Sequence, residues 1–191
     1  MSSTCKLENH DCCNHGNNRI YEQTLDELKF ESSIFGACVN NDVERVIKLI
    51  SKIKNEYLAE EINKTDMSGY TALHYAARNG NYEICKLLID SKANVNCTTK
   101  SCLSTPLHRA SYMCHSKIVQ LLLNYEANVL VQDCDGKCAL HKCVENTNRK
   151  DYRQTACILL KKCPQLLEIR DKYEKTPLDY CQDLDTILAN N

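Results

Sequence analysis

Cysteine and histidine are the residues of this sequence with the most evident capacity for chemistry, with 14 and 6 copies. They are densest near the start, at Cys5, His10, Cys12, Cys13 and His15. Thiolate and imidazole groups are ligands that suit zinc. The spacing is nevertheless poor for a zinc site, because the group contains adjacent cysteines and one Cys-x-His but no Cys-x-x-Cys pair. We therefore favour a disordered or docked leader that holds no metal, and we keep a zinc-containing module as an alternative.

Three further histidines recur at a regular interval, as His74, His108 and His141. Such a row could indicate catalytic bases or a ladder of metal ligands. If each histidine belongs to one unit of a helical repeat, equivalent atoms lie about 10 Å apart, too far to share one zinc ion at ligand distances of about 2 Å. We therefore interpret the row as structural.

The sequence contains no recognisable catalytic motif. Nucleophilic catalysis needs a nucleophile, a base within hydrogen-bond reach and a group that orients the base. Gly-x-Ser-x-Gly, His-Glu-x-x-His, phosphate-loop and dinucleotide-binding motifs are all missing from the sequence. We predict a protein that is not an enzyme and that needs no cofactor.

Short blocks that recur in the same order supply the elements that must position these residues. TALHYAA, TPLHRAS, CALHKCV and TPLDYCQ begin at Thr71, Thr105, Cys138 and Thr176, at intervals of 34, 33 and 38 residues. An aliphatic block with helical spacing, such as EICKLLI, follows each of the first three. The pattern predicts pairs of short antiparallel helices, each of which buries its apolar faces against the neighbouring pairs.

The segment DMSGYTALHYAARNGNYEICKLLIDSKANVN, residues 66–96, resembles the ankyrin-repeat consensus over its full length. The resemblance implies an all-α ankyrin-repeat solenoid of about five helix-turn-helix units with β-hairpin-like loops. It also implies that the recurrent histidine packs at the start of the first helix of each unit and hydrogen-bonds to a neighbouring loop.

The predicted domain organisation has two parts. Residues 1–31 form a cysteine-containing leader that ends in a capping helix, because Thr24 and Glu27 have the spacing of a capping box. The ankyrin-repeat domain is expected at 32–191. Its units are expected at about 32–65, 66–98, 99–132, 133–170 and 171–191.

Some residues depart from the repeat pattern. Leu103 and Cys114 stand where the third unit should carry glycine. If the backbone needs a positive φ there, each replacement costs about 1 kcal/mol. Cys138 replaces a threonine, so we expect His141 to lack the hydroxyl partner that is available to the other two histidines.

The resemblance also implies where a partner binds, because ankyrin stacks bind through their loop tips and the exposed side of the first helices, which form a concave face. Tyr70, Arg78, Tyr112 and Met113 are of the types enriched in interface hot spots and mark the predicted energetic centre. Ordinary exposed surface is the alternative. The full predicted set is Met67, Ser68, Tyr70, Arg78, Asn79, Ser101, Cys102, Ser104, Tyr112, Met113, Cys134, Asp135, Lys137, Glu145 and Asn146.

Asn96 is a candidate for modification. It matches the position at which ankyrin proteins resemble substrates of an asparagine hydroxylase, although Asn94 stands where an acidic residue is usual. A turn-forming asparagine is the stronger interpretation.

Charge and hydropathy narrow the classes of partner. The 24 basic and 25 acidic residues leave a formal net charge of −1. A nucleic-acid binder normally has a basic excess, and no apolar run approaches the length of a membrane span. We therefore predict a protein partner of unknown identity, no nucleic acid and no membrane.

The polar N-terminus lacks the apolar stretch of a secretory signal, so we expect a cytoplasmic or nuclear protein with mostly free thiols. A monomer is expected, because repeats close their core along the stack. The leading function is a protein-interaction module that acts as an adaptor, scaffold or regulator. An IκB-like inhibitor of a transcription factor is a further alternative.

Overall fold

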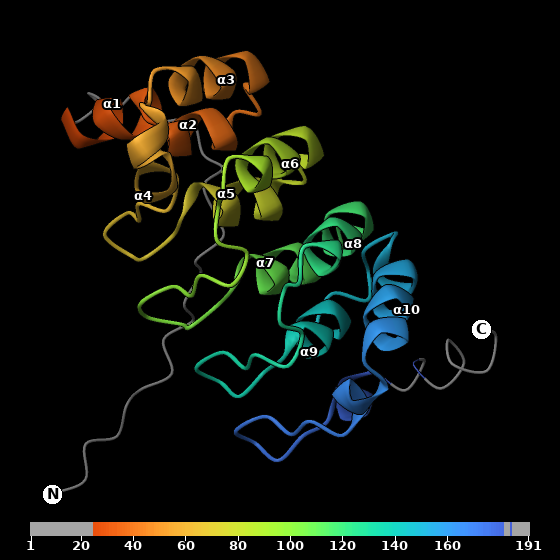
Figure 1. The fold of residues 1–191 in the computed structure, drawn as a ribbon. Coiled ribbons are helices and arrows are strands. Elements are labelled where there is room, and N and C mark those ends of the chain that lie inside the picture. Colours follow the sequence, from red (N-terminus) through yellow and green to blue (C-terminus); the bar gives the residue numbers. More distant parts are fainter. Residues whose placement is uncertain (1–24, 182–183, 185–191) are drawn as a thin grey trace, which may run out of the picture.

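The computed structural model describes residues 25–181 and residue 184 of the chain, and its architecture is a stack of helix pairs (Figure 1). Within this part of the chain every regular element is a helix, which confirms the predicted all-α ankyrin solenoid. The α-helices are α1 (Leu25–Ser32), α2 (Ile34–Val39), α3 (Val43–Ser51), α4 (Leu58–Ile62), α5 (Ala72–Asn79), α6 (Tyr82–Asp90), α7 (Pro106–Tyr112), α8 (Ser116–Asn124), α9 (Ala139–Val144), α10 (Tyr152–Lys162) and α11 (Pro177–Tyr180). Two short 3-10 helices are η1 (Asn55–Tyr57) and η2 (Pro164–Leu167).

The helices form an inner and an outer row. The inner row consists of α2, α5, α7, α9 and α11, and each of these helices contacts the next. The outer row consists of α3, α6, α8 and α10, which also contact one another in order. The loops that precede the inner helices project to one side of the stack, away from the outer row (Figure 1).

Small and aliphatic side chains make the close packing of the inner row possible. Ala76, Ala77 and Ala110 are fully buried, and they lie on the helices that pack most tightly against one another. The outer helices contribute larger buried side chains, such as Leu88 and Leu122. One unit could not cover these apolar faces alone, so the stack is the smallest stable arrangement.

The loop tips of the second to fifth units each have a positive φ at one position. Gly69 and Gly136 have φ values of 86° and 74° at this position, and Leu103 has 50°. The fifth unit has Glu174 here, at 60°. The predicted strain at Leu103 therefore has its geometric basis, because a side chain at positive φ costs about 1 kcal/mol.

The turn between the inner and outer helices has the same requirement. Gly80 has a φ of 82°, and its counterpart Cys114 has 57°. The first unit uses Asn41, at 53°, which is a residue type that tolerates this conformation. Cys114 differs from Leu103 because its side chain is buried, so its strain is partly offset by packing.

The recurrent histidines join the inner helices α5, α7 and α9 to the loop of the next unit. His74 Nδ1 lies 2.9 Å from Thr71 Oγ1 and accepts the Thr71 N–H, while Nε2 donates to the Ser104 carbonyl at 2.9 Å. His108 repeats these contacts, with Nε2 3.0 Å from the Lys137 carbonyl. These bonds support the structural interpretation of the row.

His141 lacks the hydroxyl partner of the other two histidines, as expected, but it is not left without a partner. The Cys138 thiol occupies the place of the missing hydroxyl, with Sγ 3.1 Å from His141 Nδ1. Nε2 lies 3.1 Å from the Lys175 carbonyl, as in the other units. A thiol is a weaker hydrogen-bonding group than a hydroxyl, so this link is expected to be the weakest of the three.

Helix α1 packs on the first inner helices through aromatic contacts. The Phe30 ring lies 6.1 Å from the Phe35 ring and 5.6 Å from the Tyr75 ring. The predicted capping box depends on Thr24, which lies outside the described residues. The division into a leader at 1–31 and a repeat domain at 32–191 stays a prediction.

Candidate partner-binding face

In the second, fourth and fifth units the turn at the loop tip is held by a buried or half-buried aspartate. Asp66 Oδ1 accepts the main-chain N–H groups of Ser68 and Tyr70 at 2.9 Å and 2.8 Å. Asp133 and Asp171 each accept two main-chain N–H groups in the same way, at 2.8 to 3.0 Å. These bonds fix the main chain of the tips, so the backbone that carries the exposed side chains is ordered before any partner binds.

The second oxygen of each turn aspartate bonds to the inner helix of the same unit. The bonding residue is always the fifth of the recurrent block, on the side of the helix that faces the loop tip. The pairs are Tyr75 with Asp66 at 2.7 Å, Lys142 with Asp133 at 2.8 Å, and Tyr180 with Asp171 at 2.5 Å.

These contacts shift the pKa values of the groups involved. Burial and the hydrogen bond to Asp66 raise the pKa of the Tyr75 hydroxyl. Burial alone would raise the pKa of Asp133, but the hydrogen bond to Lys142 and its charge bring that pKa below its usual value. Asp133 is therefore ionised at neutral pH and paired.

The third unit is different at both positions. Thr99 replaces the turn aspartate, and its Oγ1 accepts the Ser104 N–H at 3.0 Å. The fifth residue of the block is Arg109. Its guanidinium lies over the Tyr70 ring, with Cζ 4.9 Å from the centroid, and Nη2 donates to the Tyr70 hydroxyl.

Aromatic rings gather at the N-terminal end of the inner row. Tyr70 and Tyr75 lie 5.5 Å apart, and Tyr75 also contacts Phe35 at 6.0 Å. We call Phe30, Phe35, Tyr70 and Tyr75 the aromatic cluster.

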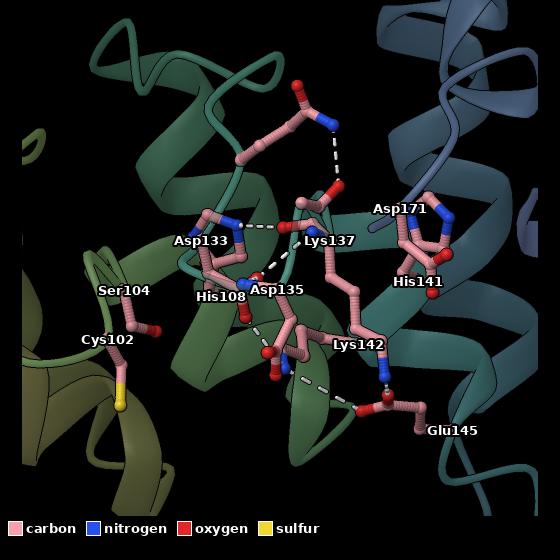
Figure 2. Close-up of polar contacts among 12 residues, drawn as sticks. Cys102, Ser104, His108, Asp133, Asp135, Lys137, His141, Lys142, Glu145 and Asp171 are labelled. Atoms are coloured by element: carbon pink, nitrogen blue, oxygen red, sulfur yellow. Dashed lines mark hydrogen bonds and ion pairs between the residues drawn. The ribbon is translucent and has the colours of Figure 1, made fainter. Parts of the chain in front are cut away.

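Charged side chains gather one unit beyond Arg109. Lys137 pairs with Glu145, and Lys142 lies 2.8 Å from Asp133 and 3.9 Å from Glu145. Figure 2 shows the side chains of Lys137, Lys142 and Glu145 converging below the loop tip. We call Asp133, Lys137, Lys142 and Glu145 the charged cluster. Because they are partly buried and paired with one another, their charges are largely satisfied within the unit.

Most of the predicted partner-binding residues lie on this face and are at least partly accessible. Met67 is the most open of them, with 96 % of its surface exposed. The exposed members are Met67, Ser68, Asn79, Ser101 and Cys134, and the half-buried members are Tyr70, Arg78, Cys102, Tyr112, Met113, Asp135, Lys137, Glu145 and Asn146. Their role in binding a partner is not decided by exposure and stays a prediction.

Ser104 is a correction to the predicted set. Only 4 % of its surface is exposed, its N–H donates to Thr99 and its carbonyl accepts from His74. Its main chain has the same place as that of Lys137, whose carbonyl accepts from His108, but the short Ser104 side chain is covered and does not lie on the exposed face.

Two predicted residues also have a role in joining units. Asn79 Nδ2 donates to the Val39 carbonyl at 3.3 Å, and Asn146 Nδ2 donates to the Tyr112 carbonyl at 2.7 Å. Substituting either asparagine would therefore change the packing between units as well as the surface.

The sequence-based set missed the fifth residue of each block, namely Tyr75, Arg109, Lys142 and Tyr180. The first three lie three residues before Arg78, Tyr112 and Glu145, which the set does include. Residues three apart on a helix share a face, so this spacing was the signal that could have found them.

Asn96 is held by the loop of the next unit. Its Oδ1 accepts the Asn128 N–H at 2.8 Å, and its Nδ2 lies 3.3 Å from the Glu126 carbonyl. Asn63 makes the same pair of contacts one unit earlier, with the Asn94 N–H and the Lys92 carbonyl. These contacts favour a structural role for Asn96, and its hydroxylation stays a prediction.

The structure also bears on metals and membranes, within residues 25–181 and 184. No group of three or more histidine, cysteine or acidic residues there could hold a metal ion. None of the helices in that part combines the length and apolar character that crossing a membrane requires. The candidate zinc ligands Cys5, His10, Cys12, Cys13 and His15 lie outside the described residues.

The repeated helix pairs, the histidine links and the loop tips define a class of protein, the ankyrin-repeat solenoids. A family model described as ankyrin repeats (3 copies) matches residues 9–99, 34–133 and 94–166. The chain therefore belongs to the ankyrin-repeat family.

Individual relatives match shorter stretches. Human ankyrin repeat domain-containing protein 39 is 43% identical over 89 residues, which cover 46% of this chain and 45% of that protein. Human inversin is 29% identical over 155 residues, covering 63% of this chain and 15% of inversin. The human SMC5-SMC6 complex localization factor protein 1 is 34% identical over 110 residues, which cover 58% of this chain and 10% of that protein. The aligned region thus spans less than half the length of each relative.

Proposed function

We propose that this chain is an adaptor, scaffold or regulator that binds a partner protein through its concave face. Ankyrin repeats are protein-interaction modules, and this chain belongs to that family. The observation that carries the proposal is the set of accessible tyrosine, arginine and methionine side chains on the loop tips and inner helices. Because the turn aspartates and histidine links hold the tips rigid, a partner would lose little free energy in ordering them.

The name of one relative is consistent with this role. That relative is a localization factor of a protein complex, as its name states. An adaptor that brings a partner to a particular assembly would need an interaction surface of this kind and no catalytic site. The IκB-like alternative is a special case of the same proposal, in which the partner is a transcription factor.

A second surface offers a competing location. The outer helices α6, α8 and α10 border a shallow groove of about 740 Å³, lined by residues such as Tyr82, Lys117 and Gln154. Few of its side chains are of hot-spot type, so we expect it to contribute less. It provides a matched control for the concave face.

The proposal is tested by quantitative affinity capture from cell extract. The baits are the wild type, the Tyr70→Ala/Tyr112→Ala variant and the Tyr82→Ala variant, each first shown by circular dichroism to be folded. Truncating hot-spot side chains should lower recovery of the specific partners at least tenfold, since each costs about 2 kcal/mol or more. The Tyr82→Ala bait should recover them as the wild type does. Equal recovery on all three baits would contradict the concave-face assignment.

Because Tyr70 also packs against Tyr75 and His74, its truncation could loosen the fold. Tyr70→Phe provides a milder test, since it keeps the ring contacts and removes only the hydroxyl that accepts from Arg109. It should be folded and should weaken binding less than Tyr70→Ala.

A further inference from the structure

The inner helices show a regular pairing that fails in one unit. In the second, fourth and fifth units the fifth residue of the recurrent block bonds to the turn aspartate of the same unit. The third unit has Arg109 in the helix but Thr99 at the turn. Arg109 could pair with a carboxylate, but Thr99 has none to offer.

The structural equivalence of Thr99 and the turn aspartates is supported by the main chain. The Thr99 N–H donates to the Ser104 carbonyl at 3.0 Å, just as the Asp66 N–H donates to the Tyr70 carbonyl at 3.0 Å. Both residues also accept a main-chain N–H across the turn through a side-chain oxygen. Thr99 thus holds the turn as the aspartates do, but it supplies no carboxylate oxygen for the fifth residue of the block on the inner helix.

Arg109 has more donors than the described residues satisfy. A guanidinium has five N–H donors, and the acceptor found for Arg109 is the Tyr70 hydroxyl. Its Nε is buried and has no hydrogen-bond acceptor in the part of the chain that the structure describes. By contrast, Lys142 occupies the same position one unit later and meets two carboxylates.

The turn aspartate of the second unit already has partners of its own. Both oxygens of Asp66 are used, Oδ1 by two main-chain N–H groups and Oδ2 by the Tyr75 hydroxyl. Arg78, at the end of α5, is a second arginine on this face, and no carboxylate among the described residues forms an ion pair with it. This half of the face is therefore cationic, and the charged cluster is balanced by its own acids.

We propose that Arg109, which is only half-buried, binds a carboxylate side chain from an aspartate or glutamate of the partner, which takes over the role of the missing turn aspartate. This inference rests on the proposed function and names the chemistry of the partner segment. A guanidinium held over a tyrosine ring offers two parallel N–H donors, which match a carboxylate. Arg78 would add a longer-range attraction to the same acidic segment.

The repeat itself suggests a sharp test. Thr99→Asp supplies the carboxylate from within the chain, so it should pair with Arg109 and compete with the partner while leaving Arg109 in place. Thr99→Asn has nearly the same shape without the charge and serves as its control. Arg109→Gln removes the guanidinium, and Lys117→Gln removes one positive charge from the outer helix α8 as a control for net charge.

The probe is a phage-displayed library of random 12-residue peptides, selected on each of the five folded proteins. The wild type, Thr99→Asn and Lys117→Gln should enrich peptides that contain aspartate or glutamate beside apolar residues. Synthetic versions of these peptides should bind Arg109→Gln and Thr99→Asp at least about tenfold more weakly. Replacing the acidic residue by its amide should cause a similar loss on the wild type.

The possible failures are distinguishable. Enriched peptides without an acidic preference, or a preference that Arg109→Gln and Thr99→Asp leave unchanged, would overturn the inference while leaving the proposed function in place. A phosphoserine peptide that binds more tightly than its glutamate version would overturn the choice of a carboxylate. No enrichment on any of the five proteins would contradict the proposed function and the inference together.

Discussion

At the scale of single residues, conformation and protonation follow from where each side chain sits in the repeat. A leucine occupies a glycine position at a loop tip because the third unit departs from the consensus, and the structure keeps the positive φ all the same. Histidines that would titrate near neutrality in water are instead enclosed between a helix and the next loop. Each of these features lowers the free energy of unfolding, the first at any pH and the second at acidic pH.

Replacing Leu103 by glycine should stabilise the protein. The residue has a φ of 50° and is 48 % exposed, so glycine relieves strain and loses little burial. We expect the free energy of unfolding to rise by about 1 kcal/mol. Leu130→Gly is the matched control, because Leu130 is similarly exposed and is not among the residues with positive φ. Its substitution should lower stability by about 0.5–1 kcal/mol. Urea unfolding measures the free energy of unfolding of both variants. A Leu103→Gly variant less stable than the wild type would be inconsistent with strain at Leu103.

Stability should fall on mild acidification. Burial lowers the pKa of both His74 and His108 to about 4, below the value near 6.5 of an exposed histidine. Between these values the unfolded chain binds protons that the folded chain does not, so stability is complete above about pH 6.5 and is lost as the pH falls toward 4. Each histidine contributes a slope of up to about 1.4 kcal/mol per pH unit.

Urea unfolding between pH 7.5 and 5 measures this slope. His108→Gln should flatten it, because glutamine does not titrate and can still bond at the start of the helix. Equal stability at pH 7 and pH 5 in the wild type would show that the histidines are not buried in neutral form.

At the scale of elements, neighbouring units act together because a histidine links each of α5, α7 and α9 to the next loop. The recurrent blocks predicted the inner helices from α5 onward and the row of histidines with little ambiguity. They could not predict α4, which has only five residues and lies in the first unit, where no block repeats. Nor could they show that the Ser104 side chain is buried, because the burial of a short side chain at this position depends on the packing of the surrounding loop.

The link at Cys138 offers a test at this scale. Cys138→Thr restores the hydroxyl found in the second and third units and should raise the free energy of unfolding by about 0.5–1 kcal/mol. Cys138→Ala removes the hydrogen-bonding group and should lower stability by about 1 kcal/mol. Thermal unfolding of the two variants beside the wild type measures the difference. If threonine proved no better than alanine, the contact between Cys138 and His141 would have no energetic weight.

At the scale of the whole molecule, the stack presents two unlike surfaces. The inner row and its loops carry aromatic and charged side chains held by short hydrogen bonds, and the outer row carries a shallow groove without such anchors. The resemblance to ankyrin repeats implied that the loop tips and inner helices form one surface. The proposed role of Arg109 came from comparing the contacts of four units. Arg109 differs from its counterparts because Thr99 stands where the other units have an aspartate.

Metal content is also a property of the whole chain. We favour a leader without bound zinc, so elemental analysis of the full-length protein, purified without chelator, should find well under one zinc per chain. One tightly bound equivalent, lost together with stability when Cys12 and Cys13 are replaced by serine, would instead support the zinc-containing module.

The central claim is that a partner lies on the concave face, and hydrogen–deuterium exchange of the chain alone and with a captured partner tests it most directly. We predict slower exchange on binding in peptides that cover the loop tips and α5, α7 and α9, with α6, α8 and α10 unchanged. Protection confined to α6, α8 and α10 would contradict the account and would place the partner on the outer groove.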